Sequence, residues 1–215
     1  MVVNDPLVLV IDGYSDHQQL KNNLVSILGK FPDRQGRKTN VKATMTDWNI
    51  ESLSPHLTDL KKYIFKTLLK NNHIQDNERV VLKYLWSNIY RKGDYTDFHD
   101  HHPEKFSFVY FLKSKWWYPS LVFPTLNRKI KPKEGRLVIF DSKLSHGVRE
   151  HVYDGLRITL NGDINVGFTK EESKIINLFL QNEYEWYNRR RERSESEIIM
   201  SYLSKQLTKI NYEKT

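Results

Sequence analysis

The first 75 residues show one short apolar run and two stretches with helical periodicity. Residues 8–11 are apolar and end at Asp12-Gly13, which predicts a buried strand followed by a turn. Across 15–29 the leucines and isoleucines recur at helical spacing, with Ser15 as the expected N-cap and Gly29 as the expected stop. A second periodic stretch covers 55–70, where Ser54 precedes a proline at the first helical position. We therefore expect one strand and two amphipathic helices.

From about residue 80 the pattern changes to one typical of β-structure. Residues 80–90 are rich in β-branched and aromatic side chains and show no helical period. Further strand-like runs follow at 106–112, 120–123, 136–140 and 156–164. Turn signals such as Lys92-Gly93-Asp94 and Asp154-Gly155 separate these runs. Several short strands at this spacing indicate a β-sandwich or barrel.

A helical pattern returns after Thr169, which forms a capping-box pattern with Glu172. There is no repeat, low-complexity linker or second core, so we expect one domain over residues 1–215. Within it, residues 1–78 would form an N-terminal support of strand and helices, 79–168 the β-core and 169–215 the C-terminal helices.

The amino-acid composition excludes several kinds of site and disfavours some partners. The chain has no cysteine, which excludes disulfides, zinc–thiolate sites and a thiol nucleophile and favours the cytoplasm. No apolar run approaches the roughly 20 residues that a membrane helix needs, so no membrane partner is expected. The net charge of +8 leaves nucleic acid open as a partner. It is not favoured, because the basic run at 189–193 contains a glutamate and no stripe of aromatic and basic residues is visible.

Three of the eight histidines lie within residues 99–102. If 99–101 is extended, His99 and His101 share one face while Asp100 points to the other. Two imidazoles on one face of a strand are spaced to hold one metal ion, with a third ligand from elsewhere. His146 is the best candidate, since it follows the strand predicted at 136–140. Three facial ligands would leave open positions on the metal.

Beyond the histidines, a wider resemblance covers residues 80–165. The segments 86–95, 99–101 and 106–112 resemble the core of 2-oxoglutarate–iron(II) oxygenases from bacteria and their phages, a group distantly similar to prolyl 4-hydroxylases. Its pattern is roughly W-x-N-x-Y-x-x-G-D-Y, then H-x-H-P, then L-S-G-V-Y-Y. The later segments 132–142, 146–148 and 157–159 resemble it too. The parts match in order and in spacing.

The resemblance implies a mainly β fold with flanking helices, a double-stranded β-helix of the jelly-roll, cupin-like type. It implies an enzyme that uses Fe(II), 2-oxoglutarate and O₂, with ascorbate as an accessory reductant. His99, His101 and His146 would hold the iron. Such an enzyme hydroxylates a C–H bond and releases succinate and CO₂. Its substrate, a protein side chain or a small molecule, cannot be identified from the residues.

The resemblance also implies a co-substrate site. Arg157 follows His146 by eleven positions and would hold the far carboxylate of 2-oxoglutarate, because a guanidinium pairs bidentately and keeps its charge when buried. The residues expected beside it are Tyr90, Thr159 and Asn88, with Trp86 on the same strand face as Tyr90.

Two departures from the pattern leave alternatives open. Most 2-oxoglutarate oxygenases as a whole use H-x-D/E, whereas here His101 takes the middle position and Asp100 precedes it, so Asp100 remains a candidate ligand. Phe108 replaces the glycine of S-G-V-Y-Y. Three histidines are also the ligands of cupin-type dioxygenases that need no 2-oxoglutarate, and a non-catalytic jelly-roll binding module is a further alternative. Arg157 separates the first alternative from the oxygenase, since a three-histidine dioxygenase has no need of it.

Overall fold

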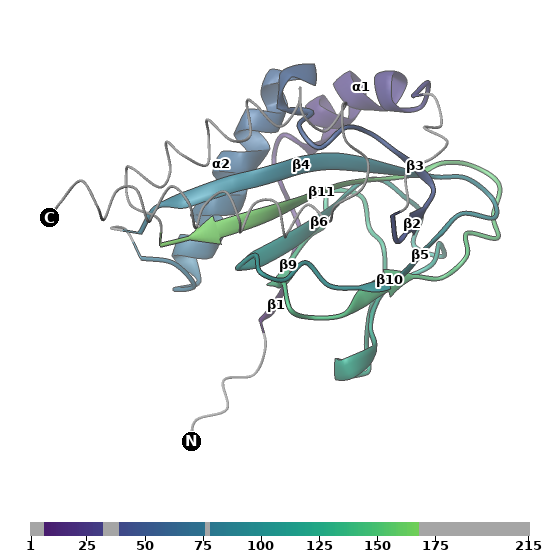
Figure 1. Cartoon of the computed structure of the whole chain (residues 1–215). Coiled ribbons are helices and arrows are strands. Elements are labelled where there is room, and N and C mark those ends of the chain that lie inside the picture. The colour runs from purple at the N-terminus through teal and green to yellow at the C-terminus, as the bar shows by residue number, and fades with distance from the viewer. Residues whose placement is uncertain (1–6, 32–38, 76–77, 168–215) are drawn as a thin grey trace, which may run out of the picture.

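The computed structural model describes residues 7–31, 39–75 and 78–167 (Figure 1). The helices predicted after Thr169, with their capping box, lie outside these ranges.

Two antiparallel sheets form the β-core. The larger sheet has the order β1 (Val8–Ile11), β9 (Leu137–Asp141), β6 (Phe106–Lys113), β11 (Arg157–Val166), β4 (Val80–Tyr90) and β3 (Thr44–Met45). The smaller sheet has the order β2 (Val41–Lys42), β5 (Tyr95–His99), β10 (His146–Val148), β7 (Leu121–Phe123) and β8 (Arg128–Ile130). Side chains from both sheets meet in one apolar cluster, including Phe111 and Phe140 from the larger and Phe123 from the smaller. This arrangement confirms the predicted jelly-roll fold class.

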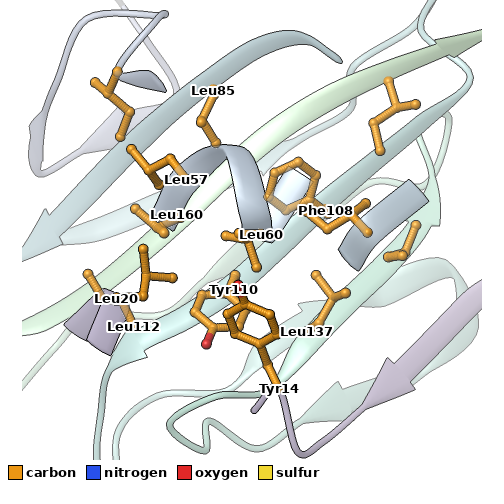
Figure 2. Packing of buried hydrophobic residues seen from close by; sticks show 14 of the residues in the cluster. Tyr14, Leu20, Leu57, Leu60, Leu85, Phe108, Tyr110, Leu112, Leu137 and Leu160 are labelled. Carbon is orange, nitrogen blue, oxygen red and sulfur yellow. The ribbon is translucent and has the colours of Figure 1, made fainter. Parts of the chain in front are cut away.

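The two predicted helices, α1 (His17–Leu28) and α2 (Pro55–Lys70), pack on the outer face of the larger sheet (Figures 1 and 2). Their buried leucines contact Phe108, Tyr110 and Leu160 in one core. Two short 3-10 helices, η1 (Glu51–Leu53) and η2 (Pro124–Leu126), complete the described elements. Within these ranges, no helix has the length and apolar character to cross a membrane.

The sequence predicted an N-cap residue for each of the two helices, and the structure agrees with the prediction for α2 only. Ser54 caps α2 by accepting the backbone N–H of His56 at 3.3 Å, as predicted. The prediction of Ser15 as the cap of α1 is wrong. Asp16 occupies that position and its side chain makes no capping bond, so this helix depends on its buried leucines rather than on a cap.

Strand β11 links the helix-covered core to the space between the sheets. Ile158 and Leu160 point into the core under the helices, whereas the alternate residues Arg157 and Thr159 line a pocket between the sheets. Because successive side chains of a strand point to opposite faces, one strand both anchors the helices and furnishes the pocket.

Gly162 is where this strand packs most tightly. A Cβ atom there would lie 2.5 Å from both the ring of Phe108 and the carbonyl oxygen of Tyr84. We expect Gly162→Ala to cost about 3 kcal/mol of unfolding free energy, at the upper end of overpacking effects. Gly13→Ala is the control: its φ of +88° strains any L-residue but its surroundings are open, so we expect about 1 kcal/mol. Urea unfolding measures both, and equal midpoints would contradict the steric argument.

Candidate active site

The pocket between the sheets brings the three predicted histidines together. His99 at the end of β5 and His146 at the start of β10 are paired across the smaller sheet. His101 lies just beyond β5, where its backbone N–H donates to the carbonyl of Ser142 at 2.8 Å. One ring nitrogen from each histidine falls within 4.8 Å of the other two. Three potential ligand atoms therefore lie close enough together to bind one metal ion.

Hydrogen bonds to the Nδ1 atoms indicate which ring nitrogen of each histidine is free to bind a metal ion. Each Nδ1 faces an oxygen: the carbonyl of Asp97 for His99 (2.8 Å), the carbonyl of Leu144 for His146 (3.0 Å) and the carboxylate of Asp163 for His101 (3.1 Å). Carbonyls and carboxylates only accept, so each Nδ1 carries the proton and each neutral imidazole keeps a lone pair on Nε2. The Nε2 atoms of His99 and His101 are 3.1 Å apart. Two lone pairs at that distance repel unless a proton or a metal ion lies between them, and three neutral imidazole nitrogens are a donor set that fits a divalent metal ion.

Burial and mutual charge keep two of the three imidazoles neutral. Burial, reinforced by the neighbouring histidines, holds the pKa of His146 well below its usual value. Burial and His101 lower the pKa of His99 in the same way. Burial also acts to lower the pKa of His101, but the charge and hydrogen bond of Asp163 outweigh it and the net pKa is raised. His101 is therefore the ring on which a proton would compete with a metal ion.

Asp100, the alternative ligand, is directed elsewhere. Its carboxylate accepts the backbone N–H of His102 at 3.1 Å, and it is not one of the residues whose ligand atoms converge. Trp86, expected on the same strand face as Tyr90, stacks on His101 with ring centroids 5.7 Å apart. The ring of His101 therefore lines the pocket and packs against the indole of Trp86.

Arg157 also lines this pocket and is fully buried, at 0% exposure. Its guanidinium lies over the rings of Tyr90 and Phe111, with centroid distances of 5.0 and 5.4 Å. Nη1 donates to the carbonyl of Pro119 at 2.9 Å, while Nε and Nη2 have no hydrogen-bond partner among the described residues. Burial lowers the pKa of Arg157 to about 10, so it stays charged at neutral pH. A buried cation with two unused donors calls for an anion.

The other residues predicted for the co-substrate line the same pocket. The hydroxyls of Tyr90 and Thr96 are hydrogen-bonded at 2.7 Å, and the amide of Asn88 lies 3.5 Å from the Tyr90 hydroxyl. The Oδ1 of Asn88 is buried and has no partner within the described part of the chain. Thr159 lies beside Arg157 on β11. Polar groups suited to an oxygen-rich ligand therefore line the same pocket as the guanidinium.

Comparison with known proteins gives matches to solved structures, whereas no family model and no curated protein matches the sequence. A viral collagen prolyl hydroxylase from Paramecium bursaria Chlorella virus-1, solved with 2-oxoglutarate, is 20% identical over 73% of this chain and 94% of its own, with a TM-score of 0.56. A Trichoplax adhaerens prolyl hydroxylase, in complex with a peptide from hypoxia inducible factor, is 16% identical over 74% and 83%, with a TM-score of 0.56. HygX from Streptomyces hygroscopicus, with nickel and 2-oxoglutarate, is 13% identical over 74% and 82%, with a TM-score of 0.55.

The chain has the fold of the 2-oxoglutarate–iron(II) oxygenases. The resemblance seen in the sequence is confirmed at the level of this oxygenase fold.

Within the oxygenase fold, the sequence had not pointed to Asn161 and Thr96, which line the pocket, or to Asp163, which hydrogen-bonds to His101. Asn161 and Asp163 follow Arg157 and Thr159 at every second position of β11, and all four are buried. Extending the alternation of this strand would have found them. Thr96 lies in β5, whose buried and exposed positions do not alternate regularly, so no local signal marked it.

Proposed function

We propose that this protein is a 2-oxoglutarate- and Fe(II)-dependent oxygenase that hydroxylates a C–H bond and releases succinate and CO₂. The observation that carries the proposal is the buried Arg157, which has two unused donors and lines the pocket that also contains the three imidazoles. A metal ion alone accounts for the histidines. An anionic co-substrate accounts for the arginine as well.

Each group of residues in the pocket would have a separate role in the reaction. The Nε2 atoms of His99, His101 and His146 would hold the iron, which when bound supplies O₂ activation coupled to oxidative decarboxylation of 2-oxoglutarate. Arg157 would pair with the 5-carboxylate of the co-substrate through its free Nε and Nη2. The Tyr90 hydroxyl is placed to donate to the same carboxylate, with Thr96 and Thr159 beside it.

Apolar side chains complete the pocket and limit its water. Val109, Leu121, Phe140 and Val148 all line it. A dry surrounding strengthens the pairing of Arg157 with a carboxylate, because charges interact more strongly at low dielectric.

The ligands of the structural neighbours support the proposal. The viral hydroxylase was solved with 2-oxoglutarate, HygX with nickel and 2-oxoglutarate, and the Trichoplax enzyme with a peptide. HygX was also solved with hygromycin B, so this fold accepts both peptides and small molecules. For this chain we propose a protein side chain or a small molecule as substrate, with nucleic acid not favoured. The single-domain division, the cytoplasmic setting and the bacterial or phage origin stay predictions.

The main alternative is a three-histidine dioxygenase of cupin type that does not use 2-oxoglutarate, and the second is a non-catalytic binding module. The first shares the metal ligands but leaves the buried charge of Arg157 without a role. The second leaves the three lone pairs without a role.

Turnover in the absence of the substrate tests the proposal. We expect the protein with Fe(II), 2-oxoglutarate, O₂ and ascorbate to release succinate slowly. Succinate is measured by mass spectrometry. Protein treated with EDTA is the control and should give none. Oxygen consumption that depends on iron but not on 2-oxoglutarate would favour the three-histidine dioxygenase instead.

A further inference from the structure

Asp163 contacts the Nδ1 atom of His101, whereas the Nε2 atom of the same ring would bind the metal. Its side chain is 4% exposed, and Oδ2 lies 3.1 Å from the Nδ1 of His101. Its second oxygen, Oδ1, accepts the hydroxyl of Ser107 at 2.7 Å. The Ser107 hydroxyl is in turn 2.8 Å from that of Ser142, whose carbonyl accepts the backbone N–H of His101. A closed set of contacts therefore ties the ring and the backbone of His101 to this carboxylate.

The charge of the site makes this contact significant. Three neutral imidazoles bring no negative charge to a divalent cation. Among the described residues, Asp163 is the carboxylate that hydrogen-bonds to a ring of the three, whereas the rings of His99 and His146 bond to backbone carbonyls. A carboxylate on the far nitrogen of a ligating histidine fixes its tautomer and raises its basicity.

We propose that Asp163 is a positioning residue that fixes His101 with its proton on Nδ1, aims Nε2 at the metal and supplies, through the imidazole, the negative charge that the three ligands lack. The inference rests on the proposed function, because it assigns a role within the same metal site. It accounts for a histidine at a position where a carboxylate ligand is usual. The carboxylate comes instead from Asp163 on β11, which contacts the Nδ1 of His101.

Replacing Asp163 by asparagine tests this role with nearly the same shape. We expect Asp163→Asn to bind Mn(II) or Ni(II) about 10- to 100-fold more weakly than wild type, the usual effect of losing such a partner. Titration calorimetry on the metal-free full chain measures this. Asp100→Asn is the matched control, since it removes an equal charge next to His101 without touching its ring, and we expect its affinity to stay close to that of wild type.

Two further measurements separate positioning from a merely structural role. In ¹⁵N NMR spectra of metal-free protein at alkaline pH, where all imidazoles are neutral, His101 should carry its proton on Nδ1 in wild type. It should shift toward the Nε2 tautomer in Asp163→Asn. Ser107→Ala keeps the carboxylate but frees its Oδ1, so it should lose less affinity than Asp163→Asn and serves if that variant folds poorly.

The outcomes distinguish this inference from the proposed function. Equal metal affinities and the same His101 tautomer in wild type and Asp163→Asn overturn the role of Asp163 and leave the proposed function intact. A wild-type protein that binds no metal overturns both.

Discussion

His146→Ala is expected to abolish stoichiometric metal binding. The structure brings together three ring nitrogens that could hold the ion, and a facial site with two of three ligands left is expected to lose a divalent ion on dialysis. Wild type should hold about one ion per chain when loaded with Ni(II) or Mn(II) as a surrogate for iron, and the variant none. Elemental analysis after dialysis gives the ratio. His146 is buried, so thermal unfolding should first show that the variant folds.

His102→Ala is the matched control for this prediction. His102 neighbours His101 but is exposed and outside the converging group, so its removal should leave the metal content unchanged. Full metal content in His146→Ala would contradict the assignment of the site.

The same measurement decides between Asp100 and His101. We expect His101→Ala to lose the metal and Asp100→Ala to keep it, because the Asp100 carboxylate is engaged with the backbone N–H of His102. The opposite result would make the carboxylate the ligand, in the order H-x-D/E with its register shifted by one.

The sequence predicted the main elements of the fold because the long elements carry strong periodic signals. Helices 17–28 and 55–70 and the strands at 80–90 and 157–166 each bury one or both faces over many residues. In the smaller sheet, the sequence predicted β7 as the run 120–123, whereas the two- and three-residue strands β2, β8 and β10 have no such signal. They form because long-range pairing, not local preference, holds them in place.

The candidate site shows the same division between local and long-range information. The resemblance gave Arg157, and alternation along β11 placed Thr159 on the same face. The same alternation would have given Asp163 had it been followed further. Alternation also placed His101 on the face of His99, on the assumption that residues 99–101 are extended, but the contact that holds His101 there could not be read from the sequence. Strand β5 ends at His99, and His101 reaches the other ligands through its backbone bond to Ser142, a residue 41 positions away whose contact leaves no local pattern.

Arg157→Ala is expected to weaken 2-oxoglutarate binding to the metal-loaded protein by two orders of magnitude or more. Removing one partner of a buried charge pair costs about 3–5 kcal/mol, because the other charge is left stranded. At about 1.4 kcal/mol per tenfold change in affinity, this corresponds to a factor of at least a hundred. Metal content should be unaffected, since the hydrogen bond that Arg157 makes goes to the carbonyl of Pro119 rather than to a histidine. Calorimetric titration of Ni(II)-loaded protein measures the effect.

Arg157→Lys and Arg157→Met refine the test. Lysine keeps a charge but loses the planar fork that meets both carboxylate oxygens, so its affinity should fall between those of wild type and Arg157→Ala. Methionine fills similar space between Tyr90 and Phe111 without a charge. Because the guanidinium is buried with two unused donors, Arg157→Met should unfold no more easily than wild type without ligand, yet bind 2-oxoglutarate as poorly as Arg157→Ala. If metal-loaded wild type does not bind 2-oxoglutarate, or if wild type and Arg157→Ala bind it equally, the co-substrate assignment fails and the three-histidine dioxygenase takes its place.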